Sequence, residues 1–136
     1  MAGAYFVDTN VFVRFFTDDS ADKGARAEAL FARARRREIT LYTTSLVIAE
    51  IVWLLSGTYG FSRGRVAEVV MAMLGNPGIE VTDRQEVAMA IVAVGEQGAD
   101  YADAFNAAHA QRRGAPGIFS WDRDFDHLDG PPRVEP

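Results

Sequence analysis

The chain of 136 residues contains no cysteine, a single lysine and only five prolines. The lack of cysteine excludes disulfides, thiol catalysis and thiolate metal sites, so any metal must be held by oxygen or imidazole ligands. No apolar run approaches the roughly 20 residues that span a bilayer, and the N-terminus lacks a basic region ahead of an apolar one. We therefore expect neither export nor membrane insertion, and a cytoplasmic location.

Basic residues are fewer than acidic ones, so the formal net charge is −5 and the sequence pI is near 5.0. This balance argues against a protein that coats nucleic acid through general electrostatics. It does not exclude an enzyme that acts on nucleic acid, because an acidic metal site becomes less anionic once it is loaded. The basic residues are nearly all arginine, in groups that fit either phosphate contacts or solvated helix faces: Arg33, Arg35, Arg36 and Arg37, then Arg63 and Arg65, then Arg112 and Arg113.

Short apolar runs alternate with helical patterns along the whole chain, and the length fits one domain covering residues 1–136. Strands are predicted at residues 4–7, 41–43, 79–81 and 118–121, and residues 133–134 fit an edge strand. Helices are predicted near 20–37, 45–56, 62–75, 83–98 and 101–113, the fourth of them opened by a capping box of Asp83 and Glu86. This alternation indicates an α/β domain with a parallel sheet, whose ligands gather outside the carboxyl ends of the strands.

Four acidic residues are the main functional signal, because each ends a predicted strand or lies in a helix rich in small or apolar residues: Asp8, Glu50, Asp103 and Asp122. Asp8 and Asp122 become neighbours if the first and fourth strands are adjacent in the sheet. Clustered carboxylates repel one another unless protons or a cation relieve them. Their hard oxygens suit Mg²⁺ or Mn²⁺, and such a metal can generate a hydroxide nucleophile and orient a phosphodiester.

Three of the four acidic residues also have a purely structural interpretation. Asp8 fits a helix cap, Asp103 fits dipole pairing at a helix start beside Asp100, and Asp122 belongs to an acidic loop that solvent alone explains. Glu50 differs, because its helix is apolar on most of its circumference and a buried glutamate needs a partner. Thr9 and Asn10 are placed to orient carboxylates or water through hydrogen bonds.

The sequence from residue 8 to residue 16 resembles the opening of a PIN domain, and in particular the VapC-type toxin ribonucleases. The resemblance continues through residues 45–50, 100–104 and 120–125, and it keeps the four acids in the family's order. It implies a three-layer α/β/α domain around a central, mostly parallel five-stranded sheet. Ser120 and Trp121 stand where the family usually has Thr-Phe, so the hydroxyl beside the last acid is retained.

The function that this resemblance implies is a Mg²⁺-dependent endoribonuclease, the toxin of a type II toxin–antitoxin system. Position by position, Asp8 and Asp103 would be the principal metal ligands, and Glu50 and Asp122 would complete the acidic pocket. Asp124 and Asp126 follow closely, which leaves open whether the last acidic role is shared. Such toxins typically cleave transfer or ribosomal RNA, are silenced by a cognate antitoxin and are usually homodimers.

Two other functions compete with this interpretation. One is a metal-free PIN-like module that binds partners without catalysis, and the other is a small phosphohydrolase with Asp8 as nucleophile. The second is disfavoured because such enzymes often carry an acid two residues further on, where this chain has Asn10. The surface around Trp53 and Leu54, with Tyr59 and Phe61 beyond it, is expected to hold an antitoxin or a second subunit.

Overall fold

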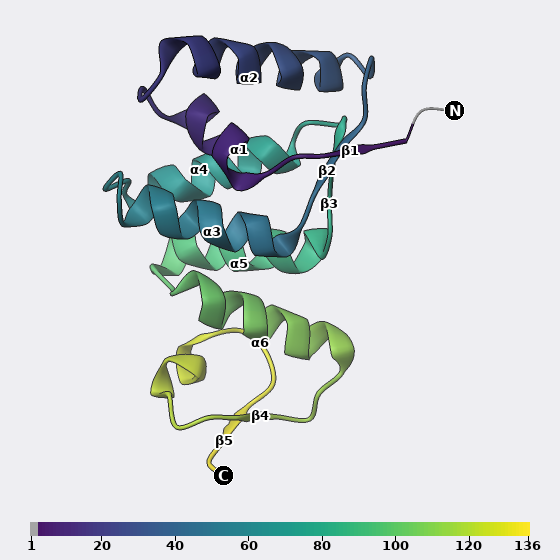
Figure 1. The fold of residues 1–136 in the computed structure, drawn as a ribbon. Helices are drawn as coiled ribbons and strands as arrows, with labels where there is room; N and C mark the ends of the chain where they lie inside the picture. The colour runs from purple at the N-terminus through teal and green to yellow at the C-terminus, as the bar shows by residue number, and fades with distance from the viewer. Residues whose placement is uncertain (1–2) are drawn as a thin grey trace.

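The computed structural model describes residues 3–136, and within them it contains six α-helices, five short strands and one 3₁₀ helix (Figure 1). In chain order the elements are β1 (Tyr5–Phe6), α1 (Thr9–Phe16), α2 (Ala21–Arg35), β2 (Leu41–Thr43), α3 (Ser45–Ser56), α4 (Arg63–Leu74), β3 (Ile79–Val81), α5 (Arg84–Gln97), α6 (Tyr101–Arg113), β4 (Ile118–Phe119), η1 (Arg123–His127) and β5 (Arg133–Val134). The alternation of strands and helices confirms the predicted α/β class.

Side-chain caps explain where three of the helices begin. Ser20, Thr44 and Ser62 precede α2, α3 and α4, and each side chain accepts a hydrogen bond from the backbone N–H three residues later. Such a bond satisfies one of the four N–H groups that a helix start leaves free. These starts depend on local chemistry alone, and the sequence predicted them.

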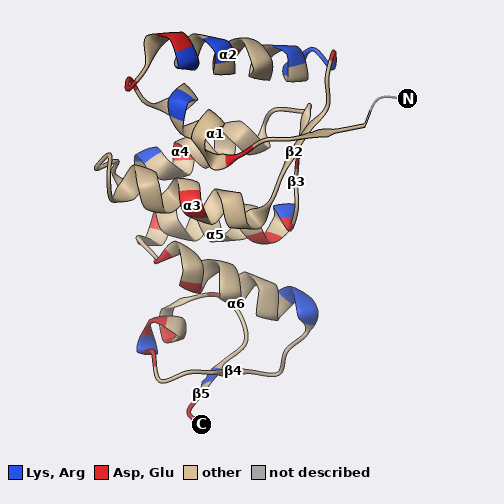
Figure 2. Cartoon of the chain, viewed as in Figure 1, with Lys and Arg blue, Asp and Glu red and all other residues tan. Residues whose placement is uncertain are grey.

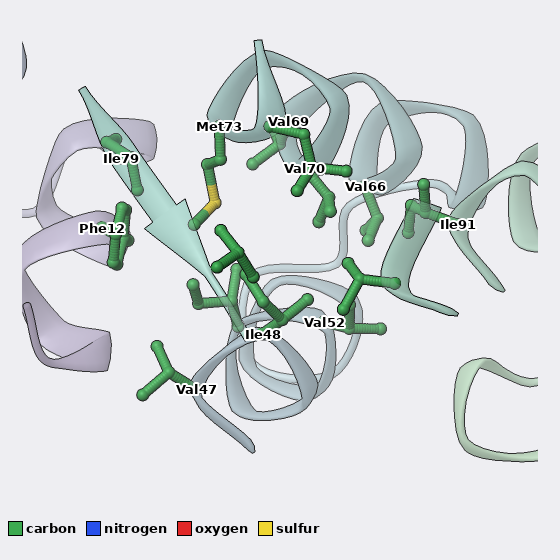
Figure 3. Packing of buried hydrophobic residues seen from close by; sticks show 14 of the residues in the cluster. Phe12, Val47, Ile48, Val52, Val66, Val69, Val70, Met73, Ile79 and Ile91 are labelled. Carbon is green, nitrogen blue, oxygen red and sulfur yellow. The ribbon is translucent and has the colours of Figure 1, made fainter. Parts of the chain in front are cut away.

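The first three strands form one parallel sheet in the order β1-β2-β3. Tyr5 aligns with Leu41, and Leu41 aligns with Ile79. Figure 1 shows these strands together at the right, with α1, α3, α4 and α5 to their left and α2 above α1. The core fills the space between these elements, and Figure 3 shows Phe12, Ile48, Val66, Val70 and other side chains converging there.

The prediction of a single five-stranded sheet is wrong. Within residues 3–136, β4 pairs in parallel with β5 alone, through Ile118 and Arg133, and these two strands form a separate sheet. The first and fourth strands are therefore not adjacent. Figure 1 shows β4, η1 and β5 beyond α6, on the side away from β1.

The cause lies in the way α6 is held on α5. Ala104 and Ala108 of α6 are buried and line one hollow together with residues of α5, and Arg112 forms an ion pair of 2.6 Å with Glu86 at the start of α5. Because only residues 114–117 separate α6 from β4, this packing keeps β4 on the far side of α6.

The predicted capping box of Asp83 and Glu86 at the start of α5 is wrong. Asp83, the residue before α5, adopts a left-handed conformation with φ 54° and makes no side-chain cap. Glu86 instead bonds to α6, a contact that no local pattern encodes.

Only one side of α3 is buried, through Val47, Ile48, Ile51, Val52 and Leu55. Trp53, on the opposite side, is 79% exposed, whereas Tyr59 and Phe61 pack partly buried against the core. Tyr59 and Phe61 therefore contribute less to the apolar surface around Trp53 than the sequence predicted. None of the helices in the described part of the chain is long and apolar enough to cross a membrane.

Candidate active site

Three carboxylates meet beside the start of α6. One oxygen from each of Asp103, Asp122 and Asp124 can be chosen so that all three lie within 4.8 Å of one another. Asp103 stands in the first turn of α6, Asp122 follows β4 and Asp124 lies in η1. The two segments come together because the chain returns from α6 through β4 to η1. We call Asp103, Asp122 and Asp124 the acidic cluster.

Local hydrogen bonds fix the backbone of the acidic cluster. The N–H of Asp103 donates to the carboxylate of Asp100, the cap of α6, at 3.1 Å. The Ser120 hydroxyl accepts from the N–H of Asp122 at 2.9 Å, and the Asp122 carboxylate accepts from the N–H of Asp124 at 2.9 Å. Each carboxylate retains free lone pairs, so the same side chains that shape the turn remain able to bind a cation.

The electrostatic environment of the acidic cluster is unfavourable to its own charge. Burial raises the pKa of Asp103, and repulsion from Asp100, Asp122 and Asp124 raises it further. A bound divalent cation would reverse this effect, because it lies close to all of these charges. An all-carboxylate donor set is the chemistry that Mg²⁺ and Mn²⁺ prefer. The residues present therefore fit such a metal.

Asp8 and Glu50 lie outside the acidic cluster and are organised differently. The Thr9 hydroxyl, itself buried, donates to Glu50 at 2.8 Å and so joins the start of α1 to α3. Asp8 precedes α1 but makes no side-chain cap, which removes the structural interpretation of this residue. Glu50 is exposed, contrary to the expectation of a buried glutamate. Asn10 lines a different cavity, between α1 and α2.

Two neighbouring cavities connect these groups. Asp103 and Asp124 line a cavity of about 380 Å³, and Glu50 lines another of about 610 Å³ together with residues of α6. Arg63 and Asp100 line both cavities, so they stand between Glu50 and the acidic cluster. The structure thus gathers Asp103, Asp122 and Asp124, and places Glu50 beside the adjoining hollow.

Two residues at these cavities were not singled out from the sequence. Arg63 had been one of several arginines that fit a solvated helix face, yet it is the basic residue that lines both cavities. His127 lines the smaller cavity with Asp124. Neither had a sequence signal of its own, because only the packing of α4 and η1 around α6 brings them there.

The distribution of charge places the site at one end of the molecule. Figure 2 shows acidic segments at the start of α6 and in η1, whereas the basic residues at the end of α2 lie at the opposite end. The arginine group at 33–37 is therefore remote from the acidic cluster. The nearer arginine, Arg63, lies at the start of α4.

Comparison with protein families gives one match, which extends over almost the whole chain. The model of the PIN domain matches residues 5–131, a range that includes Asp8, Glu50 and all of the acidic cluster. A comparison with curated proteins gives no match.

Proposed function

The chain belongs to the PIN domain family, and from this membership together with its acidic cluster we propose that it is a Mg²⁺-dependent endoribonuclease. PIN domains are commonly nucleases. The resemblance to VapC-type toxins further suggests the toxin of a type II toxin–antitoxin pair, acting on transfer or ribosomal RNA and silenced by a cognate antitoxin. Mn²⁺ would replace Mg²⁺ in the same oxygen site.

The observation that carries the proposal is the convergence of three carboxylates, one of which has a raised pKa. Asp103 and Asp122 would hold the cation, and Asp124 would share the role of Asp122. Asp126 is a poor candidate, because its carboxylate is engaged by Arg133 at 3.0 Å, which lowers its pKa. When bound, the metal would activate water and offset negative charge on the scissile phosphate.

The other residues would prepare the substrate. Glu50, held by Thr9, faces the larger cavity and would accept a proton or a hydrogen bond there. Arg63 would bind an RNA phosphate between the two cavities, since a guanidinium matches the geometry of a phosphate oxygen pair. Asp8, exposed between β1 and α1, would contribute to the metal site as the family resemblance implies.

A matched pair of variants tests the proposal. We expect Asp103→Asn to abolish Mg²⁺-dependent cleavage of transfer and ribosomal RNA and to lose most Mg²⁺ uptake in calorimetry. Asp129→Asn removes an exposed carboxylate outside the acidic cluster and should leave both unchanged. A chelator should stop cleavage by the wild type. Full activity of the Asp103 variant would contradict the proposal, as would a wild type that takes up no divalent cation.

The toxin assignment needs its own experiment. We expect expression of the wild-type chain to arrest growth, and co-expression of the protein encoded by the neighbouring gene to restore it. Asp103→Asn should not arrest growth although it folds. Arrest by this variant would favour a binding module that acts without catalysis.

A further inference from the structure

Two strands in the structure keep one hydrogen-bonding edge open. The N–H groups of Tyr5 and Val7 donate to the carbonyls of Thr40, just before β2, and Tyr42 in β2, both at 2.9 Å. The N–H and C=O of Phe6 between them therefore face away from β2. In the same way, Ile118 and Ser120 donate to the segment containing β5, and Phe119 faces away from it. Among residues 3–136, no strand pairs with either of these edges.

Large apolar side chains accompany both open edges. Tyr5 and Phe6 on β1 are 63% and 49% exposed, and Phe119 and Trp121 on and after β4 are 75% and 74% exposed. An open strand edge that also carries exposed aromatics is a template for pairing with another strand. Single exposed aromatics are ordinary, but these four lie on or directly after two strands whose outer edges are both open.

The two edges do not meet within one chain. The contact of α6 with α5, with its buried alanines and the ion pair of Glu86 with Arg112, holds β4 away from β1. A second copy of the chain presents both missing edges at once: its β4 fits the open edge of β1, and its β1 fits the open edge of β4. An unrelated peptide would satisfy only one of them.

We propose that two copies of this chain associate by adding β4 of each to β1 of the other, in parallel. Two equivalent contacts of this kind are related by a two-fold axis and form a closed dimer. The parallel direction matches every strand pair already present. In a parallel pair, a residue that faces the partner strand is aligned with one that faces away from it, so Phe6 is aligned with Ser120. Asp8, two residues after Phe6, then lies beside Asp122, two residues after Ser120.

This arrangement makes the site composite, a consequence that rests on the proposed function. Asp8 and Glu50 come from one copy, and Asp103, Asp122 and Asp124 come from the other. The convergence of Asp8 on the acidic cluster, absent within one chain, then follows from dimer formation. It also explains why β1 ends in an exposed carboxylate that caps nothing.

Cysteine cross-linking tests the pairing directly, because the chain has no cysteine of its own. Aligned Cα atoms on neighbouring strands lie about 5 Å apart, a separation that a disulfide can span. We expect an equimolar mixture of Phe6→Cys and Ser120→Cys, allowed to exchange and then mildly oxidised, to give a disulfide-linked dimer. A mixture of Met71→Cys and Ser120→Cys serves as the control, because Met71 is exposed on α4.

Two results would overturn the proposal. One is cross-linking no greater than in the Met71 control. The other is a double variant, Phe6→Cys with Ser120→Cys, that forms its disulfide within single chains at low concentration, which would show that β4 closes onto β1 of its own chain. Sedimentation of Phe119→Asp gives an independent measurement. A charge on the open edge should turn the dimer into a monomer with an unchanged circular dichroism spectrum, whereas Met71→Asp should remain dimeric.

Mixed variants connect the dimer to the site. Asp8→Asn and Asp122→Asn should each be inactive alone. In their mixture, half of the dimers are mixed and each has one intact site, so about a quarter of wild-type cleavage should return. If cross-links form without any RNA cleavage in the wild type, the pairing stands and the proposed function fails. If the wild type cleaves RNA but no cross-link forms, the function stands and the pairing fails.

Discussion

Thr9 and Glu50 form a hydrogen bond of 2.8 Å between residues that are 41 positions apart in the sequence. The bond ties the first turn of α1 to the middle of α3. Because the Thr9 side chain is buried and Glu50 is exposed, the donor is rigid and the acceptor would otherwise move freely. Thr9 is therefore a positioning residue that holds the Glu50 carboxylate toward the larger cavity.

Replacing Thr9 tests this role. Thr9→Val keeps the shape of the side chain and removes the donor, so we expect kcat for RNA cleavage to fall about 10-fold, the lower end for residues that orient a catalytic group. KM should change little, because Thr9 does not reach the cavity. Thr9→Ser keeps the hydroxyl and should restore most of kcat. Equal activity of the valine and serine variants would show that the hydrogen bond has no functional role.

Local chemistry explains which parts of the fold the sequence predicted. Caps such as Ser20 and Ser62 depend on a few neighbouring residues, and the structure confirms the starts of their helices. The partner of Glu86 was predicted wrongly because Arg112 lies on another helix, and its ion pair outweighs the local pattern. The division of the sheet has the same cause, since it follows from the packing of α6 on α5.

The sequence likewise predicted one part of the candidate site and missed another. Asp103 and Asp122 come together as expected, and Asp124 joins them because its N–H bonds to Asp122 in a tight turn. Chain spacing could not decide between Asp124 and Asp126, because the choice depends on Arg133, which engages the latter from β5. Likewise, the exposure of Glu50 depends on which side of α3 meets the core.

Arg63 and Arg65 offer a matched comparison of two arginines on α4. Arg63 lines both cavities of the site, whereas Arg65 lies over the ring of Phe61 at 5.5 Å. We expect Arg63→Ala to weaken RNA binding and to lower the slope of log affinity against log salt by about 0.7, the loss of one phosphate contact on a single strand. Arg65→Ala should keep the slope. Binding is measured by fluorescence anisotropy in chelator, and equal slopes for the two variants would contradict the role of Arg63.

The raised pKa of Asp103 predicts how stability depends on pH in the absence of metal. Its causes, burial first and then three neighbouring carboxylates, disfavour the ionised form in the folded state. Above the raised pKa, the charged side chain therefore costs stability. As the pH falls through that pKa toward the unfolded value of about 3.9, the folded state takes up the proton first and the cost disappears.

Thermal unfolding in chelator measures this cost. At pH 7 we expect Asp103→Asn to raise Tm by about 2 °C, since removing a partly buried carboxylate that its neighbours repel is worth roughly 0.5 kcal/mol once solvent screening is allowed for. The gain should shrink as the pH is lowered through the pKa of Asp103. Added Mg²⁺ should stabilise the wild type more than the variant, because only the wild type keeps the full site. A variant less stable than the wild type at pH 7 would contradict this account.

Gly78 and Gly64 should respond in opposite directions to the same substitution. Gly78 lies just before β3. Its N–H donates to the Asn76 side chain at 3.0 Å, and its carbonyl accepts from the N–H of Leu41 at 2.8 Å. A Cβ at Gly78 would overlap the backbone carbonyl of Ala34. Gly78→Ala should therefore cost about 3 kcal/mol, because α2 and β3 must separate. Gly64, in α4, has open space around its Cβ position, so Gly64→Ala should stabilise the fold by about 0.5–1 kcal/mol through helix propensity. Urea unfolding of both variants measures the two free energies. Shifts of the same sign would show that α2 and β3 do not approach each other as closely as this contact requires.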